Sequence, residues 1–259
     1  MDLGYQAGQS VLVTGGSRGI GAATVRAFTR EGVKRVHVAA RDAGSIDRLA
    51  AEVPAAEIVG HVLDLSRSTD RIRLRDVVGE VDVLVNNAGA IPQGALAGAR
   101  LPDWQRAWDL KVWGYVELTQ LALAAMTERG SGVIVNVVGV SGERPDAGYL
   151  AGSMANSALM TMTRTVGAYS LDHGVRVLGA NPGPVETQRL ADALRARAAT
   201  ELGDPERWPE FVAGYPARRI ATAEEVADTV VFLASPRSSY TSGCIVTIDG
   251  GMAWRGRAL

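Results

Sequence analysis

The chain has 259 residues, of which 47% are hydrophobic and 21% charged, with a formal net charge of −1. This near-neutral charge excludes a broad basic surface for nucleic acid, and no apolar run is long enough to span a membrane. Cys244 is the single cysteine and the first residues do not resemble a secretory signal. We therefore expect a cytoplasmic protein that acts on a small molecule, without nucleic acid, membrane or metal as partners.

Short β-branched runs alternate with longer helical patterns along the chain. Continuous apolar strands separated by helices indicate a parallel sheet that is covered on both faces. The prediction is one domain over residues 1–259 with a doubly wound, Rossmann-like α/β fold and a seven-stranded parallel sheet. Its ligand crevice should lie at the carboxyl ends of the strands. Strands are expected at 11–14, 35–39, 57–63, 81–86, 133–138, 175–180 and 244–248, and helices at 20–31, 43–52, 68–78, 103–128, 153–172 and 223–234.

The first predicted strand leads into a glycine-rich loop, Thr14–Gly21, that opens a helical pattern. Gly15, Gly19 and Gly21 allow a tight turn, let the backbone approach a diphosphate and let the helix pack closely. The helix N-terminus then offers free N–H groups and a positive dipole end to the phosphates. The first two glycines are more widely spaced than in the G-x-G-x-x-G fingerprint, so a glycine-rich turn without a ligand is the alternative.

Further motifs lie at or after the ends of later strands. They are Asp64, Asn86-Asn87-Ala88-Gly89, Asn181-Pro182-Gly183 with Thr187, and Asp249-Gly250-Gly251. Together with T-G-x-x-x-G-x-G at Thr14–Gly21, these five motifs resemble the short-chain dehydrogenase/reductase family in their order and rough spacing. The resemblance covers about residues 8–254.

The resemblance implies how a dinucleotide would bind. Asp64 would meet the adenine, the turn Asn86–Gly89 would flank the adenosine ribose and the diphosphate, and Pro182, Gly183 and Thr187 would hold the nicotinamide. The candidate cofactor-binding residues are Gly15, Ser17, Arg18, Gly19, Ile20, Gly21, Arg41, Asp64, Leu65, Asn87, Ala88, Gly89, Pro182, Gly183, Val185 and Thr187.

Charge at the end of the second strand predicts which dinucleotide binds. Ala40 stands where the resemblance places the acidic residue of an NAD site. Arg41 follows it and Arg18 lies in the first loop, and arginines suit the 2′-phosphate of NADPH. Asp42 comes too late in this alignment to act as that acid, and the alternative for Arg41 is a solvated residue at a strand end. We expect NADPH as the cofactor.

The resemblance also implies a serine, a tyrosine, a lysine and a helix asparagine for hydride transfer, with the lysine lowering the pKa of the tyrosine. An ungapped alignment puts Gly139 at the serine, Gly152 at the tyrosine, Asn156 at the lysine and Lys111 at the asparagine position. All four positions differ from the family. Two glycines in place of larger side chains are expected to leave extra room for a bulky substrate.

An alternative alignment makes Tyr149 the family tyrosine. It needs a three-residue shift and a compensating insertion before Thr163, and it puts Ser153 at the lysine position. We favour the ungapped alignment. Either alignment leaves Tyr149, Ser141 and Asn156 as candidates near the nicotinamide end.

Lys111 is one of only two lysines among 27 basic residues. Its ammonium could neutralise an alkoxide or feed a proton relay. The alternative is an exposed helix lysine, or one paired with Asp109 or Glu117. The candidate catalytic residues are Lys111, Tyr149, Ser141 and Asn156.

The segment 186–216 interrupts the alternation of strands and helices, and the resemblance implies a lid over the substrate. Its aromatic residues suit a large flat ligand, or pack the lid helices onto the core. Trp104, Trp108 and Trp113 share one predicted helix and are expected to be core or subunit contacts. The candidate substrate-binding residues are Gly139, Ser141, Tyr149, Gly152, Trp208 and Phe211.

These features favour an NADPH-dependent ketoreductase that works without the family tyrosine. A positioned general acid contributes ~10²–10⁴ in rate, whereas proximity alone contributes ~7–11 kcal/mol, so hydride transfer can survive its loss. A phenol or enol beside the carbonyl could deliver the proton, as in polycyclic aromatic polyketides. The chain resembles ketoreductases that tailor aromatic polyketide antibiotics, of the angucyclinone (simocyclinone) type.

Two other classes of function stay open. One is a non-catalytic dinucleotide-binding sensor or an inactive partner subunit, and the other is a non-redox isomerase or cyclase in the same pocket. Loss of all four catalytic side chains favours these, while the complete nicotinamide turn at Pro182–Thr187 favours the reductase. By resemblance, we expect a homotetramer or else a homodimer.

Overall fold

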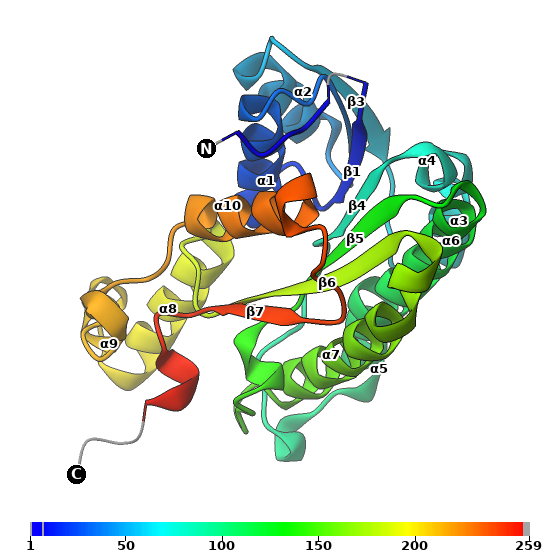
Figure 1. Ribbon diagram of the computed structural model, residues 1–259. Helices are drawn as coiled ribbons and strands as arrows, with labels where there is room; N and C mark the ends of the chain where they lie inside the picture. Colours follow the sequence, from blue (N-terminus) through cyan, green and yellow to red (C-terminus); the bar gives the residue numbers. More distant parts are fainter. Residues whose placement is uncertain (1, 7, 256–259) are drawn as a thin grey trace.

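The computed structural model describes residues 2–6 and 8–255. Its centre is a seven-stranded sheet in the order β3-β2-β1-β4-β5-β6-β7, with every pairing parallel (Figure 1). The predicted doubly wound fold is confirmed. The strand order reverses between β1 and β4, which is where such sheets bind ligands. The strands are β1 Ser10–Thr14, β2 Arg35–Ala40, β3 Glu57–Val62, β4 Val83–Asn86, β5 Gly132–Val137, β6 Val175–Pro182 and β7 Ile245–Ile248.

Helices cover both faces of the sheet, as the apolar strands require. One face packs against α1, α2 and α10, and the other packs against α4, α6 and α7. The helices are α1 Gly19–Arg30, α2 Ala43–Glu52, α3 Ser68–Ile72, α4 Arg75–Glu80, α5 Leu101–Trp108, α6 Gly114–Arg129, α7 Leu150–Ser170, α8 Gln188–Glu201, α9 Pro209–Val212 and α10 Ala223–Ala234.

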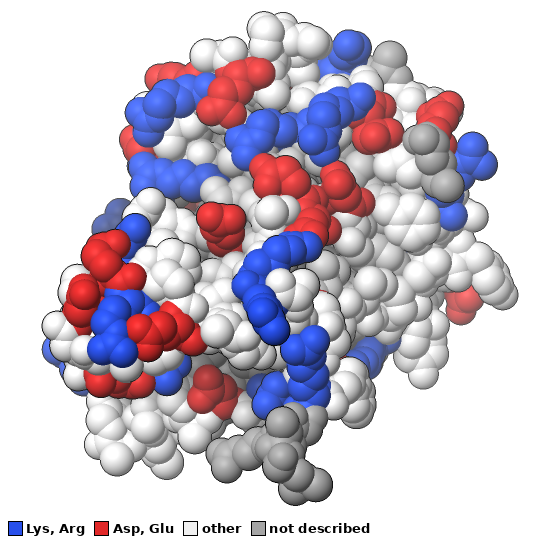
Figure 2. Space-filling view, turned by 90° about the vertical axis from the view of Figure 1, so that its left-hand side faces the viewer, with Lys and Arg blue, Asp and Glu red and all other residues white. Residues whose placement is uncertain are grey.

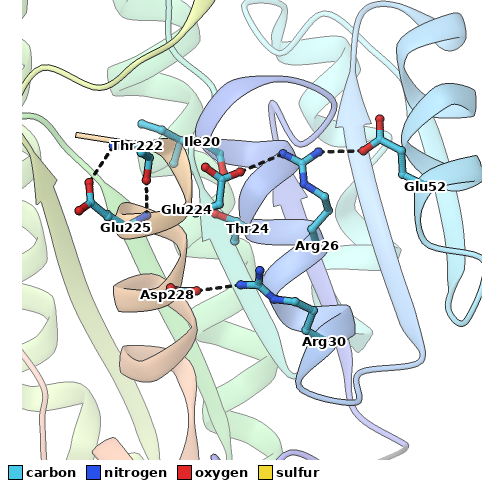
Figure 3. A network of polar contacts seen from close by, with 9 residues as sticks. All are labelled: Ile20, Thr24, Arg26, Arg30, Glu52, Thr222, Glu224, Glu225 and Asp228. Atoms are coloured by element: carbon cyan, nitrogen blue, oxygen red, sulfur yellow. Dashed lines mark hydrogen bonds and ion pairs between the residues drawn. The ribbon is translucent and has the colours of Figure 1, made fainter. Parts of the chain in front are cut away.

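Helices α1 and α10 lie side by side although they are far apart in the sequence (Figure 1). Their buried faces join one apolar core, and Figure 3 shows the charged contacts along their outer edge. Arg30 Nη2 lies 2.9 Å from Asp228 Oδ1, and Arg26 reaches both Glu52 and Glu224. Burial of the apolar faces therefore dominates this contact, because exposed ion pairs contribute little.

The single helix expected over 68–78 is two helices. The Leu74 N–H donates to the Arg71 carbonyl at 3.0 Å, a tight turn between α3 and α4. Both side chains are buried there, and Arg71 binds Glu117 of α6 through its Nε at 2.5 Å and its Nη2 at 3.0 Å. The turn directs both side chains inward.

The single helix expected over 103–128 is also interrupted. Between α5 and α6 the chain forms a π-helical turn at Asp109–Trp113, in which the Gly114 N–H donates to the Asp109 carbonyl. Arg71 Nη1 donates to the same carbonyl at 3.1 Å. Such π turns are rare and often occur at functional sites, and this one carries Lys111.

Figure 2 shows the side of the molecule on which α8, α9 and α10 lie in Figure 1. Basic and acidic side chains are interspersed on this face. Pairs in this part of the chain include Arg197 with Glu201 and Arg219 with Glu225, with N–O distances of 2.8 and 2.6 Å. Within the described residues, no helix combines the length and the apolar character needed to cross a bilayer.

Candidate active site

The glycine-rich loop after β1 is shaped for a phosphate group. Gly15 and Gly19 have φ angles of +63° and +52°, which glycine adopts without strain. A Cβ on Gly21 would overlap the carbonyl oxygen of Gly15. Arg18 gives α1 no side-chain cap, so the first N–H groups of this helix point at the crevice without a capping partner. They fit an anionic ligand.

The loop is tied to the turn after β4, across the point where the strand order reverses. Asn87 Nδ2 donates to the carbonyls of Thr14 at 3.0 Å and Gly15 at 3.2 Å. Thr14 Oγ1 accepts from the N–H groups of Asn87 and Ala88 at 2.9 and 3.1 Å. The structure thus brings the first and the third predicted motif together at the carboxyl edge.

The adenosine end carries more arginine than acid. Arg18 Nη2 lies 2.5 Å from Asp42 Oδ2, and this guanidinium lowers the pKa of the Asp42 carboxyl. Asp42 also caps α2 through the Gly44 N–H, and Arg48 lies 3.8 Å away. Two arginines therefore lie close to this carboxylate, and the exposed Arg41 precedes it in the sequence. The sequence had not predicted Arg48 or the contact of Arg18 with Asp42.

The predicted adenine contacts follow β3 directly. Asp64 Oδ1 accepts from the Ser66 N–H at 3.1 Å and from its hydroxyl at 2.8 Å. Leu65 is buried, and its carbonyl accepts from Arg71 at 2.8 Å. These contacts fix the backbone at the edge of the crevice.

The predicted nicotinamide turn follows β6 and lies against the glycine-rich loop. The Gly183 N–H donates to Ile248 at 3.0 Å, Val185 forms a bridge with Ala221, and Thr187 caps α8. A Cβ on Gly19 would lie 3.1 Å from the Thr187 methyl group. The loop expected at the diphosphate and the turn expected at the nicotinamide therefore line one continuous crevice.

The position expected for the family serine does not accept a side chain. Gly139 has a φ of +141°, and a Cβ there would lie 2.7 Å from Asn156 Nδ2. The Gly139 N–H donates to Asn181 Oδ1 at 3.1 Å, and Asn181 Nδ2 donates to Glu143 at 3.0 Å. Asn181 and Glu143 thus hold this backbone, a role that the sequence did not indicate.

Asn156 stands at the expected lysine position, and only the nitrogen of its side-chain amide is hydrogen-bonded. Its Nδ2 donates to Ser141 Oγ at 2.8 Å. Its Oδ1 is buried and has no hydrogen-bond partner within the described residues. A buried acceptor normally has a partner, so this oxygen fits a hydroxyl of a bound ligand, such as a nicotinamide ribose.

Tyr149 fills the space above Gly152. A Cβ on Gly152 would overlap ring carbons of Tyr149, which stands just before α7. The extra room expected from glycines at 139 and 152 is therefore wrong. Neighbouring side chains, Asn156 and Tyr149, occupy it because they pack directly over the two backbones.

Lys111 points back toward the carboxyl edge. Its Nζ donates to the Val138 carbonyl at 2.5 Å, and a Cβ on Gly89 would lie 3.0 Å from its Cδ. Burial, with the Arg189 guanidinium as a second cause, lowers its pKa to about 7. Pairing with Asp109 or Glu117 is wrong: Lys111 Nζ binds the Val138 carbonyl, Glu117 pairs with Arg71, and among the described residues no ion pair includes Asp109. An exposed helix lysine is also wrong, since Lys111 is partly buried.

Arg189 of α8 is the residue that the sequence missed. Its Nη1 donates to the Gly89 carbonyl at 3.1 Å, and its Nη2 donates to the Ile91 carbonyl at 3.2 Å and to the Tyr149 hydroxyl at 3.5 Å. It thereby connects the 186–216 segment to the turn after β4. Little in the sequence indicated its role, because Arg189 is one of 25 arginines in the chain.

Some of the aromatic residues pack inside the protein, and others remain candidates for contact with a ligand or a subunit. Phe211 packs under Arg197, whose Cζ lies 4.1 Å from the ring centre, so this contact lies within the 186–216 segment. Trp108 Nε1 donates to the Ala151 carbonyl at 3.1 Å, and Trp104 packs in the same apolar cluster. Trp113 is 52% exposed and is not a core residue. Trp208 is half-buried.

Comparison with known proteins matches residues 15–253 to the family model described as enoyl-(acyl carrier protein) reductase. The chain is 33% identical to 2-(S)-hydroxypropyl-CoM dehydrogenase 3 of Xanthobacter autotrophicus, over 93% of this chain and 95% of that protein. A solved short chain dehydrogenase/reductase family protein is 34% identical, with a TM-score of 0.83 and coverage of 98% and 99%. An actinorhodin polyketide ketoreductase variant with NADPH is 28% identical, with a TM-score of 0.88 and coverage of 95% and 98%.

Proposed function

Because the chain belongs to the short-chain dehydrogenase/reductase family, we propose that it is an NADPH-dependent ketoreductase with an unusual active site. The observation that carries this proposal is the close approach of Gly19 to Thr187, whose methyl group would lie 3.1 Å from a Cβ on Gly19. It joins the phosphate loop and the nicotinamide turn into one crevice, beside a cluster formed by Lys111, Tyr149 and Arg189. A sensor of the adenine half alone would not need that turn.

NADPH is the cofactor that the charge distribution favours. Arg18 and Arg48 lie 2.5 and 3.8 Å from the Asp42 carboxylate, Arg41 is its exposed neighbour in the sequence, and arginine suits a 2′-phosphate. The actinorhodin ketoreductase in the comparison was solved with NADPH. When bound, NADPH supplies the hydride. The helix α1 N-terminus would hold the diphosphate, and Asn156 Oδ1 would accept from the nicotinamide ribose.

The substrate that we propose is a polycyclic aromatic polyketide ketone, as in antibiotic biosynthesis of the angucyclinone type. The family acid and its lysine are replaced by Gly152 and Asn156, so the proton must come from another group. A phenol or enol beside the carbonyl, or water, can deliver it. Lys111 and Tyr149 lie near enough to stabilise charge that develops on the substrate. The similarity to a polyketide ketoreductase supports this substrate class.

The 186–216 segment is proposed to cover the substrate, with Arg189 as its contact to the opposite wall. Trp208 is half-buried in this segment and stays a proposed substrate contact. For Phe211 the stacking with Arg197 supports packing instead. We further propose a homotetramer or a homodimer in the cytoplasm.

The test is anaerobic mixing of the protein, NADPH and a panel of hydroxylated polycyclic ketones and quinones. We expect oxidation of NADPH, followed by its absorbance, together with a product heavier by two hydrogens. Tight NADPH binding without turnover across the panel would contradict the proposal. That outcome would favour the sensor, the inactive partner subunit or the non-redox enzyme.

A further inference from the structure

Two cations stand together at the substrate end of the crevice without an acidic partner. Lys111 comes from the π-helical turn before α6, and Arg189 comes from α8. No ion pair joins either of them to a carboxylate among residues 2–6 and 8–255. Most other arginines of α8 and the following segment have such a partner, including Arg195, Arg197 and Arg207. The lack of an acidic partner therefore distinguishes Lys111 and Arg189 from these arginines.

Both side chains approach the same residue, Gly89. The methylene groups of Lys111 lie under it, because a Cβ there would be 3.0 Å from Cδ. Arg189 donates to its carbonyl oxygen at 3.1 Å. The repulsion between the two charges also contributes to the lowered pKa of Lys111. The two cations are therefore close neighbours across the turn that follows β4.

Each cation keeps donors for a further ligand. A guanidinium has five N–H donors and an ammonium has three. The described contacts use Arg189 Nη1 once and its Nη2 twice, and they use Lys111 Nζ once. The partners are neutral backbone carbonyls and the Tyr149 hydroxyl. An anion at this position would satisfy donors and remove the repulsion between the charges.

The location points to the substrate and not to the cofactor phosphates. Lys111 binds the carbonyl of Val138, the residue before Gly139, and Arg189 reaches Ile91 and Tyr149. The phosphate loop lies at the start of α1, and its Gly19 lies close to Thr187, the N-cap of α8. Gly89 is itself a candidate cofactor residue, but Val138, which precedes Gly139, and Tyr149 belong to the end of the crevice that we propose for the substrate.

We propose that Lys111 and Arg189 form an oxyanion subsite for a phenol or enol oxygen that neighbours the reacting carbonyl. This inference rests on the proposed reductase function and names the feature of the substrate that the site selects. The carbonyl carbon receives hydride from NADPH, and the carbonyl oxygen receives the proton of the neighbouring hydroxyl. The O–H bond of that hydroxyl breaks, and its electron pair stays on oxygen as a phenolate or enolate. The two cations stabilise this charge where it develops, and water later returns the proton.

The test measures ionisation of a bound phenol without turnover. The probe is 1-hydroxyanthraquinone in the complex of the full chain with NADP⁺, which cannot donate hydride. Its visible absorbance reports the phenolate during a pH titration, and 1-methoxyanthraquinone is the control ligand that cannot ionise. We expect the pKa of the bound probe to fall by about one unit or more below its value in solution.

Variants assign the shift to the two cations. Arg189→Gln and Lys111→Met should each lose most of it, whereas Arg195→Gln, a matched arginine of the same helix, should keep it. NADP⁺ affinity should be unchanged in Arg189→Gln. A probe that fails to bind, a probe that keeps its solution pKa, or a shift that survives Arg189→Gln would overturn the subsite. Weaker NADP⁺ binding in Arg189→Gln would overturn it too, because Arg189 would then belong to the cofactor.

The probe titration, taken together with the NADPH turnover panel, separates the subsite from the proposed function. A lowered pKa of the probe together with no reduction of any ketone would support the anion subsite and overturn the reductase. Reduction of ketones, with equal rates for free and methylated phenols and no shift of the probe, would support the reductase and overturn the subsite.

Discussion

The two ends of the crevice use glycine in opposite ways. At the phosphate end, Gly15 and Gly21 let backbone segments approach each other closely, and Gly19 leaves room for the Thr187 side chain. At the chemical end, Gly139 and Gly152 yield their space to the side chains of Asn156 and Tyr149. The phosphate end therefore keeps the shape that its sequence motif predicts. The proposed chemical end has other side chains at the positions expected for the family residues, and Lys111 and Arg189 are the cations that we propose act there.

The largest effect is expected from Lys111→Met, which tests whether the proposed chemical end is catalytic. Loss of one group that stabilises developing charge typically lowers kcat by ~10²–10³. We expect such a loss in steady-state turnover, with NADPH affinity retained in a fluorescence titration. The control is Lys34→Met, the other lysine, which is exposed and distant from the crevice. Unchanged turnover in Lys111→Met would mean that the two ends of the crevice differ in shape and that the charge of Lys111 has no catalytic role.

Gly21→Ala tests whether the phosphate end is sterically closed. A methyl group there would overlap the Gly15 carbonyl and lie 2.6 Å from Asn87 Nδ2. Overpacking of this kind costs roughly 1–3 kcal/mol, so NADPH affinity should fall by about fivefold or more if that cost is borne by the loop that binds it. The matched control is Gly79→Ala on α4, where the nearest atom lies 3.8 Å away. Equal NADPH affinity in both variants would show that the loop can accommodate a methyl group at Gly21.

Gly139→Ser reinstates the family side chain at the chemical end and should lower stability. A φ of +141° strains any L-residue, and the new Cβ would press on Asn156. Such strain costs about 1–3 kcal/mol, which thermal unfolding would detect. A variant with wild-type stability and higher turnover would mean that the family arrangement still fits here, and the contrast between the two ends would disappear.

The charge on Lys111 is expected to change near neutral pH. Burial and Arg189 lower its pKa from 10.5 to about 7, so turnover that needs the ammonium should decline as pH rises through about 7. Between these two values the unfolded chain binds the extra proton, so the contribution of Lys111 to stability rises with pH across this window. Arg189→Gln should move the pKa of Lys111 upward.

Reductive methylation with ¹³C makes this titration visible, because only Lys34 and Lys111 carry ε-amines. Lys111→Arg assigns the two signals in the NMR spectrum. A Lys111 signal that stays fully protonated up to pH 10 would contradict the account of a partly buried cation beside Arg189.

The smallest effect is expected from Arg30→Gln, because Arg30 lies outside both ends of the crevice. The pair with Asp228 is solvent-exposed, with side-chain exposures of 58% and 66%. Exposed pairs contribute roughly 0.2–1 kcal/mol at most, so Tm and NADPH affinity should hardly change. A large loss of NADPH affinity would show that the α1–α10 contact in Figure 3 controls the phosphate end.

Much of the fold could be predicted because it depends on local patterns. Continuous apolar strands and the glycine loop identified the parallel sheet and its crevice. The breaks at Leu74 and at the π-helical turn could not be predicted. They arise where Arg71 is drawn inward to Glu117 and to the Asp109 carbonyl, and such tertiary contacts leave no periodic signal.

The candidate site divides in the same way. Sequence motifs identified the phosphate end, because the local geometry of that loop requires each of its glycines. Arg189 could not be identified, because its significance depends on Gly89, Ile91 and Tyr149, which are distant in sequence. Sequence placed Lys111 at a catalytic position, but only the structure shows that it lacks an acidic partner among the described residues.

The most direct test of the central claim is a single-turnover reaction with NADPH that carries deuterium at C4 of the nicotinamide. With a polycyclic ketone that bears a phenol beside its carbonyl, we predict an alcohol with one deuterium on the former carbonyl carbon. The transfer should occur although Gly152 and Asn156 replace the family tyrosine and lysine. Bound NADPH that keeps its deuterium, with the ketone recovered unchanged, would contradict the account.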